Sequence, residues 1–336
     1  FGTEHHELSL DAEPLRHYPS VIWAAEEPKE NLLQGYLLAE FARRRVKAVL
    51  GGLGGDELFA GYTVHRFMAA AAGLHGFVPR GLQRRLLAPM SRGLFTLQDR
   101  PAWRRFDQYR RGLQLGLAAG DPCGYYSILR NVWDGDPGAF SRYGPAWDGV
   151  EIAPTRAALD PYFPPGGHAL RQTLDAELQT KMINDFLLNE DRTSMAHSLE
   201  VRVPFLDRQL VRFARRIPVD LLAPGRETKA LFRRALGGLL PEHALRKKKW
   251  GFTVDPYQQF QKDLRTTARR VLTPERVARR GWFDPAYLDS ILDHPPHPRM
   301  RWHYFFLWVA VGLEIWAQLF LEGDVAAPRL ELEDFA

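Results

Sequence analysis

The stretch from residue 46 to residue 62, VKAVLGGLGGDELFAGY, constrains the fold of this chain more than any other segment. Its first five residues form an apolar run that predicts a short buried strand. Four glycines follow within five positions, and Asp56 and Glu57 then open a predicted helix. This order of strand, glycine turn and helix is typical of an α/β protein.

The glycine turn has the composition of a phosphate-binding loop. Glycines let backbone N–H groups approach a phosphate closely, and the start of a helix adds partial positive charge there. A carboxylate beside such a turn can hold Mg²⁺ through its oxygens. We therefore interpret the segment as a nucleotide-phosphate site with a metal at its edge. A tight turn whose Asp caps the helix remains the alternative, and the lack of a G-K-[ST] ending excludes a Walker P-loop.

Length, charge and cysteine content narrow the class of protein. With 336 residues, the chain can form one large domain or two smaller ones. Its single cysteine, Cys123, excludes an intramolecular disulfide framework and a multi-cysteine zinc site. The net charge of +5 is mild and the basic clusters are short, so we predict no nucleic-acid partner. An anionic substrate such as ATP suits this charge equally well, and no signal peptide is visible, which predicts a cytoplasmic protein.

One segment near the end of the chain is almost apolar enough to span a bilayer. Residues 304–321 read YFFLWVAVGLEIWAQLFL. They include Glu314 and Gln318, which are four residues apart on one helix face. Charge inside a membrane is costly, so we predict a core helix with one polar edge and no membrane partner.

The first 62 residues are predicted to be α/β, and the rest of the chain mainly helical. We expect strands at residues 7–10 and 46–50, and helices at residues 31–45, 66–117, 170–189 and 229–240. Residues 134–167 are predicted to form a long irregular connection. Because a parallel sheet needs several βαβ units, two strands are too few. The chain begins with Phe1, and we expect the missing strands to precede it in a longer protein.

A second informative segment, residues 191–207, reads DRTSMAHSLEVRVPFLD. Its charged residues lie among apolar residues of the kind found in cores, which predicts paired charges at a partly buried junction. The alternation from residue 199 to residue 203 predicts an extended segment that ends at Pro204.

A third segment, residues 227–252, reads ETKALFRRALGGLLPEHALRKKKWGF. Lys229 stands at the start of a predicted helix, where the macrodipole disfavours a cation. A bound anion would explain its position, although a solvated lysine is the simpler account. The lysines at 247–249 precede Trp-Gly-Phe, which is consistent with a solvated helix end or with a loop folded over a phosphate.

Together, the three segments resemble the synthetase domain of glutamine-hydrolysing asparagine synthetase and its relatives, which include β-lactam synthetase and lasso-peptide cyclases. The family patterns are roughly SGEGADELFGGY, DRxSMAHGLEVRxPFLD and ETKxxLRxAxxxxLPxxxxxRxKxGF. They appear here in the same order at residues 51–62, 191–207 and 227–252. The opening FGTEHHELSL also resembles the family's GTEHHE segment, and the resemblance runs from residue 1 to about residue 320.

This resemblance implies a partial parallel sheet of the pyrophosphatase-loop ATPase type, which is adenine nucleotide α-hydrolase-like, followed by a mainly helical region. The implied synthetase domain covers residues 1–325, with residues 1–62 as its remaining α/β part and residues 326–336 as a tail. The implied enzyme is a C–N ligase. A carboxylate such as aspartate attacks the α-phosphate of ATP to give an acyl-adenylate, and ammonia from glutamine then forms the amide. Family members also suggest a homodimer.

The resemblance also assigns individual residues. Asp56 takes the position of a Mg²⁺ ligand, and Gly51 and Gly52 take positions that contact ATP. Lys249 takes the position of the catalytic lysine, and Lys229 is implied to contact pyrophosphate. ATP and Mg²⁺ are therefore the implied cofactors.

The chain departs from the family in three ways. The SGGxDS loop and the glutaminase domain are both absent, so we expect this fragment alone to be inactive and to fold poorly. Within the glycine turn, Leu53 stands where asparagine synthetases commonly carry Glu, and leucine cannot accept a proton. Leu53 leaves two alternatives open: a lactam- or peptide-forming cyclase, and a non-catalytic homologue. A tRNA-modifying enzyme of the same fold would suit the charge but not the 191–207 motif.

Overall fold

The computed structural model describes most of the chain. The described residues are 2–9, 13–74, 85, 112, 114–115, 118, 120–131, 142–151, 153–224, 227–247, 254–324, 326 and 330–335. The predicted helical region 66–117 therefore lies largely outside the described residues, and so does Lys249.

Two short strands form a parallel sheet, which confirms the coarse prediction of an α/β chain that is mainly helical. β1 (Ala48–Leu50) pairs with β2 (Glu200–Arg202), and Val49 lies opposite Val201. The backbone N–H of Gly51 donates to the carbonyl oxygen of Arg202 at 2.7 Å, so the pairing continues into the glycine turn. The extended segment predicted before Pro204 is confirmed. Because the strands are parallel, both end at the same edge of the sheet.

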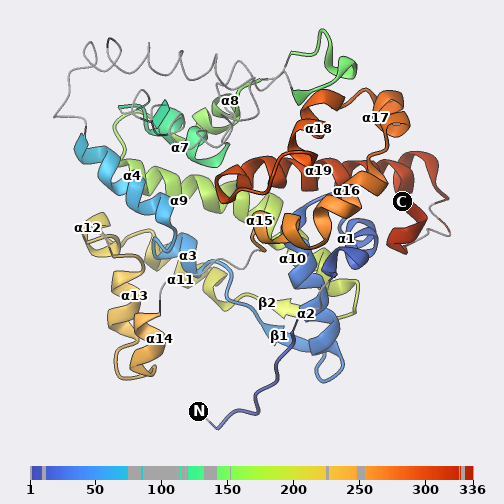
Figure 1. The fold of residues 1–336 in the computed structure, drawn as a ribbon. Helices are drawn as coiled ribbons and strands as arrows, with labels where there is room; N and C mark the ends of the chain where they lie inside the picture. Colours follow the sequence, from blue (N-terminus) through green and yellow to red (C-terminus); the bar gives the residue numbers. More distant parts are fainter. Residues whose placement is uncertain are drawn as a thin grey trace.

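The predicted burial of the first strand is wrong. Leu50 is 76 % exposed, and Ala48 is exposed as well. In the part of the chain that the structure describes, β1 pairs only with β2. The helix α10 (Leu188–Met195) packs on β2 rather than on β1 (Figure 1). The strand at residues 7–10 is also not found, because residues 7–9 are irregular and residue 10 lies outside the described residues.

Helices make up most of the remaining described chain. The α-helices are α1 (Tyr18–Ala25), α2 (Leu33–Arg43), α3 (Gly55–Leu58), α4 (Thr63–Leu74), α7 (Pro122–Arg130), α8 (Thr155–Leu159), α9 (Ala169–Gln179), α11 (Arg208–Ala214), α12 (Val219–Leu222), α13 (Ala230–Ala235), α14 (Glu242–Arg246), α15 (Pro256–Gln259), α16 (Arg265–Val271), α17 (Pro274–Arg280), α18 (Pro285–Leu292) and α19 (Arg301–Ala317). The 3₁₀ segments are η1 (Pro14–His17), η2 (Glu30–Leu32), η5 (Pro145–Trp147), η6 (Asp160–Tyr162), η8 (Pro204–Leu206), η10 (Pro298–Met300) and η12 (Leu332–Phe335). The π-helical segments are η7 (Met182–Leu187), η9 (Phe260–Leu264) and η11 (Gln318–Glu322).

The first hydrophobic core joins the two ends of the chain. Residues of α1 and η1 pack against α15, α16, α18 and α19, and the last described turn, η12, adds Leu332 and Phe335 (Figure 1). Tyr18 meets Trp308 edge to face, with ring centres 6.2 Å apart. Gly312 makes this approach possible, because a Cβ there would lie 2.5 Å from the Tyr18 hydroxyl oxygen.

The apolar segment near the end of the chain is a core helix, as predicted. The helix from Pro298 to Glu322 is long and apolar enough to cross a membrane by length and composition. In the structure, Glu314 is 3 % exposed and pairs with the Arg280 guanidinium at 3.0 Å. Gln318 donates to the same carboxylate at 3.0 Å, so the polar edge predicted from the sequence faces a matching cation.

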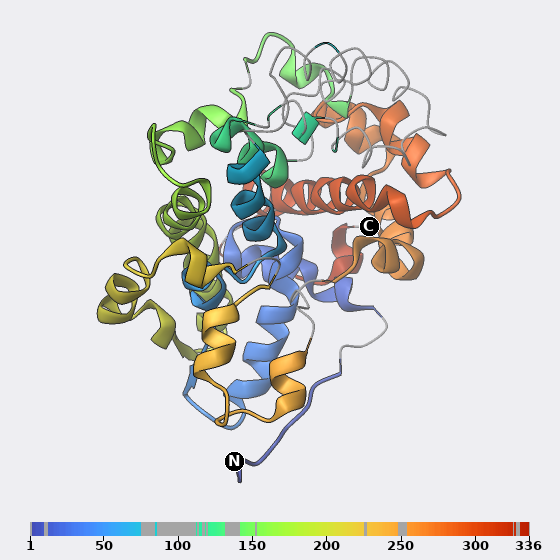
Figure 2. The ribbon, with the colours of Figure 1, turned by 90° about the vertical axis from the view of Figure 1, so that its left-hand side faces the viewer.

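The second hydrophobic core lies beside the glycine turn. Here α4 packs against α9 and α7, while α11, α12 and α13 close the other side (Figure 2). The helix predicted at residues 170–189 is real but composite, because α9 leads into the π-helical segment η7 and then into α10. The four-residue spacing of Leu174, Leu178, Met182 and Phe186 predicts one apolar face. Leu174 and Met182 are both 2 % exposed, whereas Leu178 and Phe186 are half-buried. The helix predicted at 229–240 ends earlier, at Ala235, before two glycines.

Candidate active site

The turn after β1 requires glycine in one place for two reasons. Gly54 has a left-handed backbone (φ +92°), which L side chains rarely adopt, and it precedes α3. A Cβ there would also lie 2.5 Å from the Leu206 side chain. Gly52, by contrast, is exposed and has open space around it. The predicted helix α3 is only one turn long, so its dipole adds little to the site.

Asp56 forms an ion pair with Lys229, although the two residues come from different motifs. The Lys229 ammonium lies 3.0 Å from Oδ1 of Asp56, and both side chains are largely buried. Lys229 has a left-handed backbone (φ +53°) just before α13. Such a conformation costs about 1–3 kcal/mol for a residue other than glycine and tends to occur at functional sites. The sequence therefore placed Lys229 correctly at a helix start, and the anion beside it in the structure is Asp56.

Gly61 provides the space in which this pair forms. A Cβ at Gly61 would lie 1.8 Å from Oδ1 of Asp56 and 2.5 Å from Cε of Lys229. Its backbone N–H donates to the Asp56 carbonyl oxygen at 2.8 Å. Sequence reasoning missed Gly61, because its importance depends on a lysine that is distant in the sequence.

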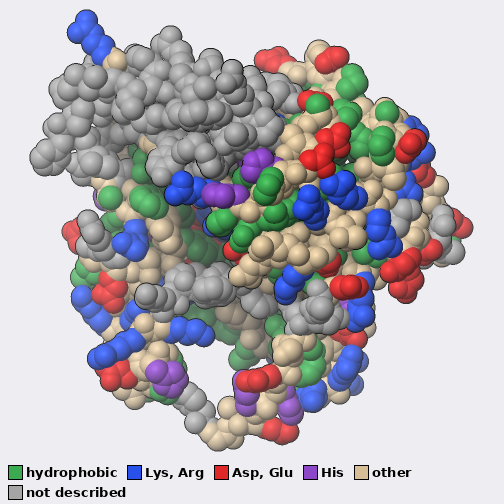
Figure 3. All heavy atoms as spheres, in the orientation of Figure 1, with side chains coloured by type: hydrophobic (Ala, Val, Ile, Leu, Met, Phe, Trp, Pro, Cys, Tyr) green, Lys and Arg blue, Asp and Glu red, His purple; other side chains and the backbone are tan. Residues whose placement is uncertain are grey.

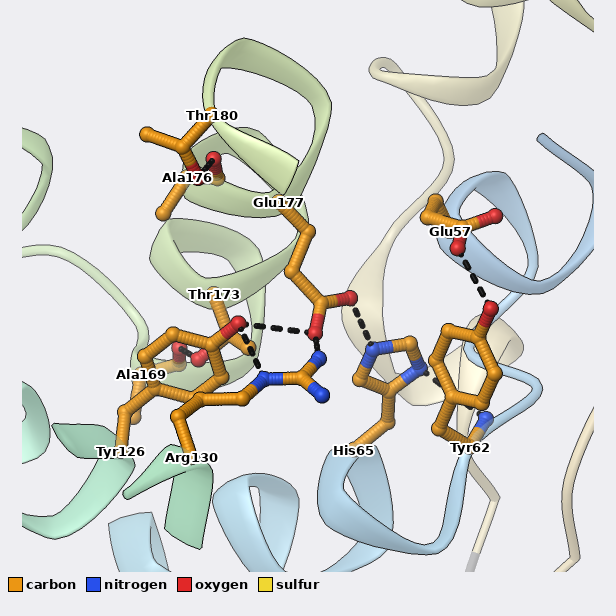
Figure 4. Close-up of polar contacts among 10 residues, drawn as sticks. All are labelled: Glu57, Tyr62, His65, Tyr126, Arg130, Ala169, Thr173, Ala176, Glu177 and Thr180. Atoms are coloured by element: carbon orange, nitrogen blue, oxygen red, sulfur yellow. Dashed lines mark hydrogen bonds and ion pairs between the residues drawn. The ribbon is translucent and has the colours of Figure 1, made fainter. Parts of the chain in front are cut away.

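Glu57, the neighbour of Asp56 in α3, is buried. It is 1 % exposed, and the Tyr62 hydroxyl donates to its Oε1 at 2.6 Å (Figure 4). Burial, with Glu57 nearby, raises the pKa of Tyr62 well above its ordinary value, so this hydroxyl keeps its proton. The five-residue spacing of these two residues within the motif was the only sequence signal for their contact.

A buried carboxylate, Glu177 of α9, gathers the polar groups behind the turn. The structure shows His65 Nε2 2.6 Å from Oε2 of Glu177 and the Tyr126 hydroxyl 2.8 Å from Oε1, with Arg130 paired to the same oxygen (Figure 4). The Tyr62 backbone N–H donates to His65 Nδ1 at 3.3 Å, so Nε2 carries the imidazole proton. Burial, followed by the nearby Arg130, lowers the pKa of His65 to about 3. In this network, the charge of Glu177 is balanced by Arg130 and satisfied by hydrogen bonds, and His65 is neutral. We therefore assign the network a structural role.

Lys181 lies over the Tyr62 ring. Its ammonium nitrogen is 4.6 Å from the centre of the Tyr62 ring and 4.0 Å from that of Phe186. Burial, followed by Arg130, lowers the pKa of Lys181 to about 7. Nothing in the sequence distinguished Lys181 from a solvated lysine.

The motif at 191–207 packs directly on the glycine turn. β2 lies beside β1, and the side chains of Phe205 and Leu206 pack against Gly54. The predicted pairing of charges is present, although the pairs lie nearer the surface than expected. Arg192 pairs with Glu26 at 3.1 Å, and Arg202 pairs with Glu200 at 2.9 Å.

The structure thus brings parts of all three motifs to one place. Gly51, Asp56 and Lys229 lie at or next to the carboxyl end of β1, beside β2. Leu53 is half-buried in the same turn. Lys249 lies outside the described residues, so its position relative to the others stays a prediction.

Comparison with known proteins decides the family. The model of the asparagine synthase family matches residues 1–318, which is nearly the whole chain. The chain belongs to the asparagine synthase family. The resemblance inferred from the three motifs is confirmed.

Individual relatives share this chain's sequence at moderate identity. It is 25 % identical over 316 residues to asparagine synthetase [glutamine-hydrolyzing] 1 of Bacillus subtilis, covering 90 % of this chain and 46 % of that protein. It is 31 % identical over 244 residues to a putative asparagine synthetase [glutamine-hydrolyzing] of Mycobacterium bovis, covering 70 % of this chain and 34 % of that protein. The chain therefore spans less than half the length of these curated relatives.

Proposed function

We propose that this chain forms the amide-synthesising part of an ATP-dependent C–N ligase. In this reaction, a substrate carboxylate attacks the α-phosphorus of ATP, giving an acyl-adenylate and pyrophosphate. An amine then attacks the acyl carbon, the amide bond forms, and AMP leaves. Following the names of the relatives, aspartate is the first carboxylate to test, with ammonia from glutamine as the amine.

The observation that carries this proposal is the ion pair between Asp56 and Lys229 at the end of β1. In open α/β sheets, ligands bind outside the carboxyl ends of the strands. Lys229 supplies a cation for phosphate oxygens, and the open face at Gly52 lets a ligand approach the backbone. Lys249, in the third motif, is the further lysine that we propose to stabilise the developing charge.

The described residues supply part of a ligand set for Mg²⁺. They contain no group of three metal-binding side chains, but Mg²⁺ is often held by one or two carboxylates together with substrate phosphates. Asp56 is the carboxylate that we propose for this role. A bound Mg²⁺ would neutralise charge on the phosphate oxygens, while Lys229 would exchange its contact with Asp56 for one with phosphate.

Leu53 favours a second candidate function. An aliphatic side chain in the glycine turn offers no hydrogen bond to ammonia or to a small amine. A cyclase that joins a carboxylate and an amine of the same substrate positions its nucleophile through the rest of that substrate. We therefore keep a lactam- or peptide-forming cyclase as the alternative.

The partners that we propose are small molecules: ATP, a carboxylate and an amine. On the face shown in Figure 3, Lys and Arg side chains are interspersed with Asp and Glu. A homodimer and a cytoplasmic location are further proposals that follow from the family.

Isotope transfer tests the proposed function. The intact protein is incubated with ATP, Mg²⁺, ammonium chloride and a panel of ¹⁸O-labelled carboxylates that begins with aspartate. We expect AMP that contains one ¹⁸O from the carboxylate, together with unlabelled pyrophosphate. Formation of ADP and phosphate would overturn the adenylate route, and no nucleotide turnover with any carboxylate would support a non-catalytic homologue.

A substitution at the proposed metal ligand sharpens this test. Asp56→Asn keeps the shape of the side chain but removes the charge that Lys229 and Mg²⁺ require. We expect AMP formation to fall by about 10²–10³-fold, as when a charge-stabilising group is removed. Asp293→Asn is the matched control, because Asp293 is exposed and pairs with Arg269 at the surface.

A further inference from the structure

Glu190 is a carboxylate at the edge of the sheet where the glycine turn lies. It belongs to the first turn of α10, the helix that runs into β2 through a short turn. Its Oε1 lies 3.3 Å from the position that a Cβ on Gly51 would occupy. Because Gly51 has no side chain, the Glu190 carboxylate packs directly against the backbone of the turn.

Glu190 is half-buried, and among the described residues it lacks the paired cation that the buried carboxylates Glu177 and Glu314 have. Its Oε2 is buried without a hydrogen-bond partner, and no cation among the described residues pairs with it. Burial, with no charged neighbour contributing, raises the pKa of Glu190. By contrast, Glu177 is held by Arg130, and Glu314 by Arg280.

A carboxylate oxygen that is buried without a hydrogen bond or a cation lowers the stability of the fold. Groups of this kind are often found at functional sites, where they bind a ligand or take part in a reaction. The other two carboxylates at the turn are already engaged, since Asp56 pairs with Lys229 and Glu57 accepts from Tyr62. Leu53, in the turn itself, cannot accept a proton. Among these residues, Glu190 is the carboxylate that remains available for acid–base chemistry.

We propose that Glu190 is the general base of the amide-forming step, supplied to the glycine turn from α10 in place of the acidic residue that Leu53 does not provide. The amine nitrogen bonds to the acyl carbon, and the bond from that carbon to the AMP phosphate oxygen breaks. AMP leaves with the electron pair, and the proton lost by the nitrogen passes to a Glu190 oxygen. This role rests on the proposed function.

The two half-reactions place different demands on Glu190. Activation of the carboxylate needs ATP, the cations and the substrate, but no base for an amine. Aminolysis needs the base. ATP–pyrophosphate exchange reports the first step, and amide formation from ammonium chloride reports the second.

The test compares Glu190→Gln with the wild-type protein in both assays, using the carboxylate that supports exchange and starting with aspartate. We expect exchange to stay within about threefold of wild type, while amide formation falls by about 10²–10⁴-fold, the usual effect of losing a general base. Glu40→Gln is the matched control, because Glu40 is only partly buried on α2 and pairs with Arg44 at the surface. It is expected to leave both assays unchanged.

A second variant tests the spatial argument. Adding Leu53→Glu to Glu190→Gln returns a carboxylate to the same turn, and we expect it to restore amide formation by about tenfold or more. Rescue is not expected if Glu190 only supports the fold.

The outcomes are distinguishable. Equal amide formation by Glu190→Gln and wild type would overturn the proposal, and so would a parallel loss of exchange and amide formation. If the wild type itself shows no exchange with any carboxylate, the proposed function fails, and the role of Glu190 fails with it.

Discussion

Among single residues, Gly61 has the clearest effect on the site, because its missing side chain leaves room for Asp56 and Lys229. The sequence motifs identified the Asp and the Lys, since each has chemistry of its own. They did not identify Gly61, Tyr62 or Glu190, whose roles depend on side chains from distant segments. A single motif does not show which side chains from other segments pack against its residues.

Gly61→Ala tests this steric argument. The added methyl group overlaps Oδ1 of Asp56, so the ion pair must open or the turn must shift. We expect the affinity for Mg-ATP to fall by about tenfold or more, which corresponds to about 1.4 kcal/mol. Isothermal titration calorimetry measures this affinity.

Gly35→Ala serves as the control for Gly61→Ala, because a Cβ at Gly35 meets its nearest atom at an ordinary 3.8 Å. Ala is also favoured over Gly within a helix such as α2. An unchanged affinity in Gly61→Ala would show that the turn does not need this glycine.

Among elements, the composite helix α9–η7–α10 contributes most to the site, because it supplies Glu177, Lys181 and Glu190. Its apolar periodicity predicted the helix and half of the buried face, because Leu174 and Met182 are buried whereas Leu178 and Phe186 are half-buried. The π-helical segment η7 was not predicted, because the sequence analysis assumed one regular α-helix over residues 170–189. The exposure of β1 was not predicted either, since an apolar run does not reveal whether other elements cover it.

The neutral His65 on α4 gives a pH-dependent stability. An unfolded histidine takes up a proton near pH 6.5, whereas folded His65 does so only near pH 3. As the pH falls through this window, the unfolded state binds more protons, and the free energy of unfolding falls by about 1.4 kcal/mol per pH unit. The contribution is fully present above pH 6.5.

Replacing this histidine should remove that pH dependence. We expect His65→Gln to show a shallower loss of stability than wild type between about pH 6.5 and pH 4, measured by urea unfolding. His243→Gln, at an exposed position on α14, is the control. An identical slope in His65→Gln and wild type would show that His65 is protonated in the folded protein.

The terminal helix allows a matched test of burial. Leu307 is fully buried on α19, and Leu321 is 59 % exposed in η11. We expect Leu307→Ala to lower the free energy of unfolding by about 2–5 kcal/mol and Leu321→Ala by about 0.5 kcal/mol or less. Equal losses in denaturant unfolding would contradict the placement of this helix in the first core.

For the whole molecule, the arrangement brings together motifs that are far apart in the sequence. The sequence predicted the α/β class and the family, because the motifs are long and specific. It did not predict that α1 packs on α19, or that α13 brings Lys229 to Asp56. These contacts depend on how the elements of the two cores pack beside the turn. Helical periodicity predicts which face of a helix is apolar, but not which element packs against that face.

We infer that the turn after β1 binds the phosphates of ATP with Mg²⁺ at Asp56. Calorimetric titration of the intact protein with ATP, with and without Mg²⁺, tests it most directly. We predict that Mg²⁺ strengthens binding by about tenfold or more in the wild type, and that Asp56→Asn loses this gain. Equal Mg-ATP binding by Asp56→Asn and wild type would show that Asp56 does not hold Mg²⁺. No binding by the wild type would show that this turn is not an ATP site.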